Sequence, residues 1–328
     1  MTWDVDYLRD NRDENMGFLS KTLLPDGTEI PGTNFDYNYL QHRKVDVLSS
    51  ALDFILPFEK YKITAGAKVS FTNTRNGINY DTSDPTLVQD DYFRYKEQIY
   101  ALYADYSREY SERFSMQLGL RMEHTRTTGI SEAKDTEDKH DYTRLFPTVY
   151  LLYSPTDGHA LNFSFSNRIS RPSQNMVNPF PFYQNKYTYA CGREDLKPSY
   201  TYNVELGYTL KNNFNVSAYY SYSDDVFFQV VDLDAETNVT SFLWENFMQT
   251  HAFGLNNSYT FRTKWLQAYA QHGVSYRRTT SSAATTSPEE KGWAYDASLR
   301  NTFFFNEKKT LLATLSGSYS SRQYQASI

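Results

Sequence analysis

The sequence contains a single cysteine, Cys191, among its 328 residues. One cysteine excludes an internal disulfide framework and the zinc sites that several cysteines build together. An excess of positive charge is also missing, because 33 Lys and Arg stand against 39 Asp and Glu, a net charge of −6. The composition therefore argues against a nucleic-acid-binding protein, and no nucleic-acid partner is expected.

Long hydrophobic runs are absent as well. No stretch approaches the ~18 apolar residues that a membrane-spanning helix needs. Residues 1–6 read MTWDVD, with acids where a secretory signal peptide has basic and then apolar residues. The chain is therefore soluble, cut from a longer precursor, or crosses a membrane with strands. The third possibility tolerates the mean hydropathy of −0.66, because half of each barrel strand faces a polar lumen.

Aromatic residues are the abundant class, with 29 Tyr and 22 Phe. Such a composition is not that of a disordered chain. Aromatics supply 17% of the residues within a hydrophobic share of 40%, so few aliphatic residues remain. A conventional enzyme with cores rich in Leu and Val therefore fits poorly.

Strict alternation of apolar and polar residues is the main structural signal. Residues 114–123 read FSMQLGLRME and residues 62–71 read KITAGAKVSF, so every second side chain is apolar. A period of two predicts β-strands with one apolar face, and no helix is predicted. We expect about thirteen strands, near 2–10, 37–56, 61–80, 92–107, 113–128, 142–154, 159–170, 199–210, 214–231, 240–262, 265–280, 292–305 and 310–324.

Short and long connections alternate between these strands. Outer-membrane barrels have this asymmetry, with short periplasmic turns and long outward loops, whereas a soluble β-sandwich has no reason to sort its loops. The predicted fold is thus an all-β, antiparallel up-and-down transmembrane β-barrel. Short turns are expected near 57–60, 107–112, 154–158, 211–213, 262–264 and 306–309, and long segments near 11–36, 81–91, 129–141, 171–198, 232–239 and 281–291.

Charges avoid the apolar faces of these strands. Lys62 and Lys68 lie on the polar face of one strand, and Arg121 and Glu123 on that of another. A Lys or Arg facing lipid at the bilayer midplane costs ~2–4 kcal/mol. We therefore expect the polar faces to line the lumen.

One series of motifs points to a family. A strand ends in Arg171-Pro172, a loop carries Asn178-Pro179, and further motifs follow at 192–198 (GREDLKP) and 205–208 (ELGY). The series resembles the barrel part of TonB-dependent receptors, in the Bacteroidetes-type outer-membrane β-barrel family. It covers about residues 110–230 well, and the rest of the chain by its general pattern. The family has Asn-Pro where this chain has Arg193-Glu194, and Glu where it has Ser199.

The resemblance implies a barrel of about 22 strands with an N-terminal plug inside. On that basis residues 1–328 are expected to be a single β-barrel domain fragment, about thirteen of those strands, truncated at both ends and without the plug. The C-terminal residues 324–328 also lack the terminal aromatic that such barrels usually carry.

The resemblance further implies a function and a location. The protein is expected to import a scarce ligand, such as a siderophore, cofactor, oligosaccharide or peptide, across the outer membrane of a Gram-negative bacterium. Outer-membrane lipid surrounds it, and the TonB energy-coupling complex acts through the missing plug. A surface lipoprotein capping the barrel is left open. No catalysis and no resident cofactor are expected. The alternatives are a passive porin-like channel, an outer-membrane hydrolase and a soluble β-sandwich.

Candidate site residues fall into two groups. Aromatic side chains of the long segment could stack on a sugar or siderophore, and their alternative role is to pack the segment onto its neighbours. These candidates are Phe180, Phe182, Tyr183, Tyr187 and Tyr189. The motif residues are expected to be structural: Arg171, Pro172, Asn178, Pro179, Gly192, Leu196, Lys197, Pro198, Glu205 and Gly207, with Glu205 as a lumen-facing charge suited to pair with an Arg.

Metal and catalytic sites have weaker signals. Acids between residues 132 and 141 are dense enough for calcium but lack a regular spacing, which favours a solvated loop. The six histidines show no zinc motif. His124 and His272 are the candidates for a hydrolase, and pore-wall or interface positions are the preferred interpretation.

Overall fold

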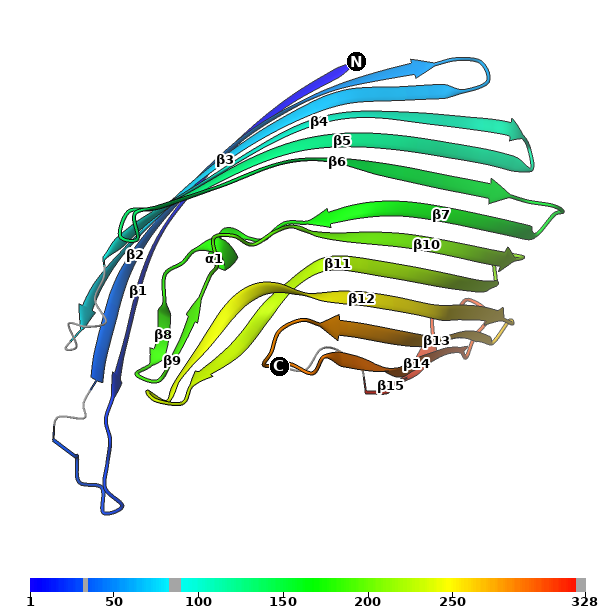
Figure 1. The fold of residues 1–328 in the computed structure, drawn as a ribbon. Coiled ribbons are helices and arrows are strands. Elements are labelled where there is room, and N and C mark those ends of the chain that lie inside the picture. Colours follow the sequence, from blue (N-terminus) through cyan, green and yellow to red (C-terminus); the bar gives the residue numbers. More distant parts are fainter. Residues whose placement is uncertain (32–34, 83–89, 323–328) are drawn as a thin grey trace.

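The computed structural model describes residues 1–31, 35–82 and 90–322. It is one strongly curved antiparallel sheet in which successive strands lie side by side (Figure 1). This confirms the predicted up-and-down architecture. The path runs through β1 (Thr2–Ser20), β2 (Phe35–Pro57), β3 (Lys62–Thr82), β4 (Asp91–Ser111), β5 (Phe114–Ser131), β6 (Thr136–Tyr153), β7 (His159–Ser170), β10 (Ser199–Leu210), β11 (Phe214–Asp234), β12 (Val239–Arg262), β13 (Leu266–Ser281), β14 (Glu289–Phe304) and β15 (Leu312–Ser320).

The connection between β7 and β10 holds elements that the sequence pattern does not predict. They are the helix α1 (Gln174–Val177) and the strands β8 (Phe182–Asn185) and β9 (Thr188–Cys191). The expectation of no helix is therefore wrong, and the sheet has 15 strands within the described residues. Elements of four residues are too short to display a period in the sequence. No helix in the described part of the chain is long and apolar enough to cross a membrane.

Two predicted long loops are partly strand. β1 continues to Ser20, although a loop is expected over residues 11–36, and only a turn at 132–135 separates β5 from β6. The strand pairing continues there, but polar residues occupy both faces over much of these stretches, as at 11–15 (NRDEN) and 135–141 (DTEDKHD). A strand with two polar faces shows no apolar alternation, so the sequence pattern ends before the strand does. Residues 324–328, which lack the terminal aromatic usual in such barrels, lie outside the described residues.

The two faces of the sheet differ as predicted. On β5, Leu118, Leu120 and Met122 point outward and remain exposed, whereas Glu123 and Thr125 point inward and are buried. The apolar residues thus form the outer face, which suits lipid contact. The prediction that Arg121 and Glu123 occupy the opposite face is confirmed.

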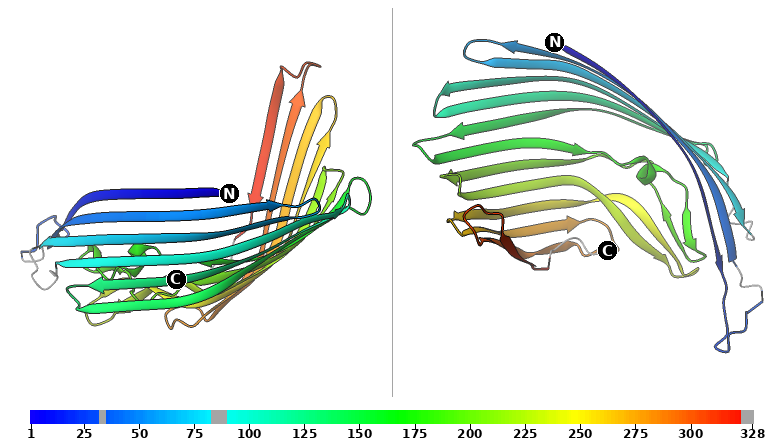
Figure 2. Two further views of the ribbon diagram at one scale, coloured as in Figure 1. Left: turned by 90° about the horizontal axis from the view of Figure 1, so that it is seen from above. Right: turned by 180° about the vertical axis from the view of Figure 1, so that it is seen from behind.

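The sheet is open within the described residues. Its edges are β1, which pairs with β2, and β15, which pairs with β14. β6 pairs with β7 only from Thr148 to Tyr153, so the two strands separate beyond that point. Residues 171–198, here called the inner segment, lie on the concave side of the sheet (Figures 1 and 2).

The largest buried cluster lies between the inner segment and the sheet. Its rings and aliphatic side chains come from the inner faces of β2, β3 and β4 and from the inner segment itself. Burying this apolar surface stabilises the segment on the wall. The cluster comprises Phe35, Tyr37, Tyr39, Ile78, Phe93, Val177, Phe180 and Leu196.

Candidate functional site

Proline residues break the strand pattern within the inner segment. Pro172, Pro179 and Pro198 stand at its start, middle and end, and proline cannot donate to a β-ladder. Between them a single helical turn forms, with the Met176 amide donating to the carbonyl of Ser173 at 2.9 Å. The chain therefore leaves the sheet after β7 and returns to it at β10.

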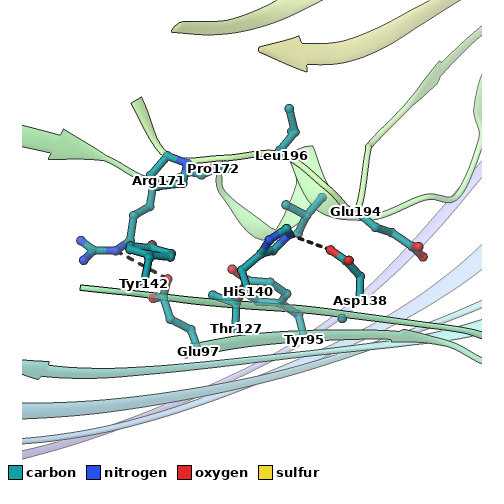
Figure 3. Close-up of a pocket in the computed structure, with 13 residues that line it drawn as sticks. Tyr95, Glu97, Thr127, Asp138, His140, Tyr142, Arg171, Pro172, Glu194 and Leu196 are labelled. Atoms are coloured by element: carbon teal, nitrogen blue, oxygen red, sulfur yellow. Dashed lines mark ion pairs between the residues drawn. The ribbon is translucent and has the colours of Figure 1, made fainter. Parts of the chain in front are cut away.

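Arg171 anchors the start of the segment to the wall. Its Nη2 donates to Glu123 Oε2 at 2.5 Å and to Thr125 Oγ1 at 3.1 Å. Its Nε lies 3.9 Å from Glu97 Oε2, a contact that Figure 3 shows. Arg121 also bonds Glu123, so two Arg and two Glu form one network. Because the network is largely buried, its charge-assisted hydrogen bonds act in a lower dielectric than those of a surface ion pair.

The two halves of the segment meet at Asn178 and Gly192. The Gly192 amide donates to the Asn178 carbonyl at 2.8 Å, and the Arg193 amide donates to the Met176 carbonyl at the same distance. Asn178 is fully buried, and a Cβ at Gly192 would lie 2.2 Å from its carbonyl oxygen. Only glycine fits such a close backbone approach. The motif at Asn178 and the motif that begins at Gly192 are separate in the sequence but meet in the structure, and this contact is here called the joint.

The end of the segment is fixed to β12. The Lys197 amide donates to Asn246 Oδ1 at 2.8 Å, and Asn246 Nδ2 donates back to the Lys197 carbonyl at 2.9 Å. Leu196 is 4% exposed in the buried cluster. Sequence reasoning missed Asn246, because an asparagine on a strand carries no signal of a distant partner.

Arg193 and Glu194, which stand where the resembled motif has Asn-Pro, both have partners in the structure. Arg193 pairs with Asp195 and with Glu245 of β12, each at 2.6 Å. Glu194 accepts a hydrogen bond from Thr136 Oγ1 at 3.1 Å, and partial burial raises the pKa of Glu194 above its usual range. These contacts connect the segment to β6 and β12.

The structure divides the predicted aromatic candidates. Phe180 is 2% exposed and contacts the ring of Phe93, with centroids 6.2 Å apart. Tyr183 contacts Tyr37 and Tyr189, with centroids 5.2 and 5.3 Å apart. Phe182 similarly contacts the ring of Tyr39, with centroids 6.1 Å apart. Tyr187 is different, because it lies in the β8–β9 turn and is 53% exposed.

Little open space remains under the segment. A small cavity of about 20 Å³ lies between it and the wall (Figure 3), enough for roughly one water molecule. His140 Nε2 lies 2.7 Å from Asp138 Oδ2 at its edge. The cavity is lined by Tyr95, Glu97, Thr127, Gly129, Asp138, His140, Tyr142, Arg171, Pro172, Val177, Glu194, Leu196 and Pro198.

Glu205 and Gly207 lie elsewhere on the inner wall. They border an open, polar hollow of about 260 Å³ together with Asn162. A Cβ at Gly207 would lie 2.3 Å from Asn162 Oδ1, so the amide covers the glycine. The expected pairing of Glu205 with an Arg is not found among the ion pairs of the described chain.

The cysteine and the candidate histidines have ordinary structural partners. Within the residues that the structure describes, no three His, Cys, Asp or Glu gather to hold a metal ion. Burial raises the pKa of the Cys191 thiol, which donates to the Pro179 carbonyl at 3.0 Å. A raised thiol pKa disfavours the reactive thiolate. His124 contacts Thr143, and His272 lies beside the ring of Tyr295.

An up-and-down antiparallel sheet with an apolar outer face, and with the inner segment packed on its concave side, is the architecture of an outer-membrane β-barrel. The chain belongs to the outer membrane protein beta-barrel family, which matches residues 1–328. It therefore resides in the outer membrane of a Gram-negative bacterium. A comparison with curated proteins gives no match.

Solved structures share the fold. The copper transporter OprC is 13% identical with a TM-score of 0.57, covering 90% of this chain and 52% of its own. The ferripyoverdine receptor of Pseudomonas aeruginosa is 14% identical with a TM-score of 0.50, covering 97% and 47%. The Serratia marcescens hemophore receptor HasR is 11% identical with a TM-score of 0.50, covering 96% and 66%. The chain thus spans about half the length of the first two.

Proposed function

We propose that this chain is the barrel portion of a TonB-dependent outer-membrane receptor that imports a scarce ligand. The observation that carries the proposal is the folded inner segment, held on the wall by Arg171 and by the buried cluster. A passive channel needs an open lumen, and this segment occupies part of it. The arrangement therefore favours selective binding and transport over free diffusion, and over catalysis.

The ligand contacts are proposed at the aromatic tip of the segment. Tyr187 is exposed, and Tyr183 and Tyr189 lie beside it in the same hairpin. Tyrosine offers an apolar ring face and a polar tip, which suit a sugar, a siderophore, a cofactor or a peptide. Phe180 and Phe182 are proposed to support this surface from below.

The partners follow from the same proposal. Outer-membrane lipid covers the apolar face of a single barrel domain, and the TonB complex supplies the energy through a plug. A surface lipoprotein above the barrel would deliver an oligosaccharide or peptide. The three structures named above belong to a copper transporter, a ferripyoverdine receptor and a hemophore receptor. Siderophore-like metal complexes are therefore the first ligands to test.

The test works for a ligand of any identity. Spent medium from wild-type cells and from a deletion strain is compared by mass spectrometry under iron limitation. We expect a compound that wild-type cells deplete and the deletion strain does not. Its depletion stops when TonB is deleted, because import is energised. Depletion that persists without TonB would instead identify a passive channel.

Variants of the full-length gene product locate the ligand contacts. Tyr183→Ala combined with Tyr187→Ala should reduce uptake of that compound about tenfold or more, since each lost aromatic contact is worth about 0.5–1.5 kcal/mol beyond its buried area. Tyr319→Ala on the outer face of β15 is the matched control and should leave uptake unchanged. Normal uptake by the double variant at normal surface expression would contradict the assignment.

A further inference from the structure

Four basic residues gather on the outer face of β2, β3 and β4. Lys44 of β2 is paired in register with Arg75 of β3, and Arg75 is paired with Arg94 of β4. Lys96 lies two residues from Arg94 on the same face of β4. These four residues, here called the basic row, come from three separate parts of the sequence.

The row faces outward. On β3, Thr74 and Asn76 on either side of Arg75 are buried against the interior. On β4, Phe93 next to Arg94 is fully buried under the inner segment. Because successive side chains of a strand point to opposite faces, the row lies on the same face as the apolar residues of the wall.

Its depth corresponds to the lipid head groups. The outer face is apolar up to Leu48 on β2, Phe71 on β3 and Tyr100 on β4, and the row begins four residues beyond each. Four residues of a strand span ~13 Å, and a tilt near 45° reduces this to ~9 Å above the apolar band. Long Lys and Arg side chains also reach along the surface towards charged groups.

No carboxylate of the described sheet forms an ion pair with the row. Asp46 lies two residues from Lys44 on the same face but forms its ion pair with Arg9 at 2.6 Å, and Asp141 pairs with Arg126 at 2.8 Å. Arg94 Nε donates to the neutral Asn73 Oδ1 at 3.3 Å. The four basic residues therefore stand close together without a paired anion from the described chain. Like charges directly opposite each other on neighbouring strands destabilise a sheet.

A similar pair of basic residues in the other half of the sheet has a carboxylate beside it. Arg278 of β13 and Lys291 of β14 are also paired in register on the outer face. There Glu289 contacts both cations, and its distance to Lys291 Nζ is 3.1 Å. The described chain supplies a paired anion there and supplies none at the basic row. An anion from outside the chain would neutralise the positive charges of the row.

We propose that the basic row binds the phosphate groups of outer-leaflet lipid. Arg75 and Arg94 can each hold a phosphate with two parallel hydrogen bonds, and the Lys residues add point charges. The acyl chains of the same lipid would lie on the apolar band directly next to the row. This site is independent of the transported ligand, because it faces away from the lumen.

The test uses the full-length gene product in detergent micelles with diphosphoryl lipid A as the probe. Binding is measured by native mass spectrometry for the wild type and for a Lys44→Gln, Arg75→Gln, Arg94→Gln triple variant. We expect affinity to fall about 100-fold in the triple variant, about fivefold for each charge removed. The Arg278→Gln, Lys291→Gln variant is the matched control and should change affinity less than about twofold.

Two measurements on the wild type keep the test valid if the triple variant fails to fold. Lipid A with its phosphates removed should bind about 100-fold more weakly, and added NaCl should weaken binding of the intact lipid. Equal binding of both lipids would overturn the proposal. So would an equal loss in the control variant, or displacement of the lipid by millimolar inorganic phosphate, which would assign the row to a soluble anion.

Discussion

At the scale of single residues, close contacts on the inner wall restrict which side chains the chain accepts. Gly192 sits against the backbone of Asn178 and Met176. Gly66 and Gly254 lie directly under the rings of Tyr103 and Tyr219 on neighbouring strands. Such glycines let large side chains lie flat along the wall, which keeps them out of the lumen.

Replacing Gly192 with Ala should loosen the inner segment. The added methyl group must displace the backbone of Asn178, and overpacking of this kind costs about 1–3 kcal/mol. Trypsin should therefore cleave the folded variant faster than the wild type at the exposed Lys186, and the cleavage rate is the measurement. Gly317→Ala is the control, because nothing lies within 4 Å of its added Cβ. Equal cleavage rates in the two variants would argue against the joint.

At the scale of elements, Arg171 attaches the start of the inner segment to β5, and Arg193 and Lys197 attach its end to β12. Arg171 supplies a largely buried polar connection, and the buried cluster supplies the apolar one. Removing Arg171 would leave Glu97 and Glu123 close together with Arg121 as their remaining cation. The connection therefore serves the sheet as well as the segment.

Arg171→Met should lower the free energy of unfolding by about 3–5 kcal/mol, the usual cost of breaking a buried ion pair from one side. Urea unfolding of the reconstituted protein measures it. Arg193→Met is the matched control, since its side chain is 47% exposed and exposed pairs are worth about 1 kcal/mol or less. A double-mutant cycle with Glu123→Gln isolates the coupling. A loss no larger than that of the control would refute the anchoring role.

At the scale of the whole molecule, the curved sheet presents one face to lipid and one to the lumen. Leu120 on β5 is outward and half exposed, while Gln117 three residues earlier points inward. The bilayer therefore distinguishes two positions that lie on the same strand. That distinction can be measured directly.

Leu120→Arg should destabilise the inserted protein by about 2–4 kcal/mol, because the charge faces hydrocarbon near the midplane. Gln117→Arg should change stability by less than about 1 kcal/mol, since its side chain reaches the aqueous lumen. Urea titration in phospholipid vesicles, followed by the gel mobility of the folded form, compares the two. Equal losses would mean that the two faces are assigned incorrectly.

The sequence by itself determined the long strands, their faces and the family. Alternation at 114–123 and at 62–71 is a local property, because a lipid-facing and a lumen-facing side chain must follow each other along the strand. The apolar band and the inward position of Glu123 followed from that constraint. The barrel class followed from the alternation of short and long connections, and the family from the motif resemblance. The motif from Arg171 to Gly207 located the inner segment, although not its shape.

Only the tertiary structure decided what the polar parts of the chain do. Polar residues occupy both faces of β1 at 11–15, and α1, β8 and β9 are only four residues long, so none of them leaves a periodic signal. The pairing of Asn246 with Lys197 and the joint of Asn178 with Gly192 join residues that are distant in sequence. The basic row likewise exists only in the register of three strands, because sequence spacing does not specify which side chains become neighbours across a sheet.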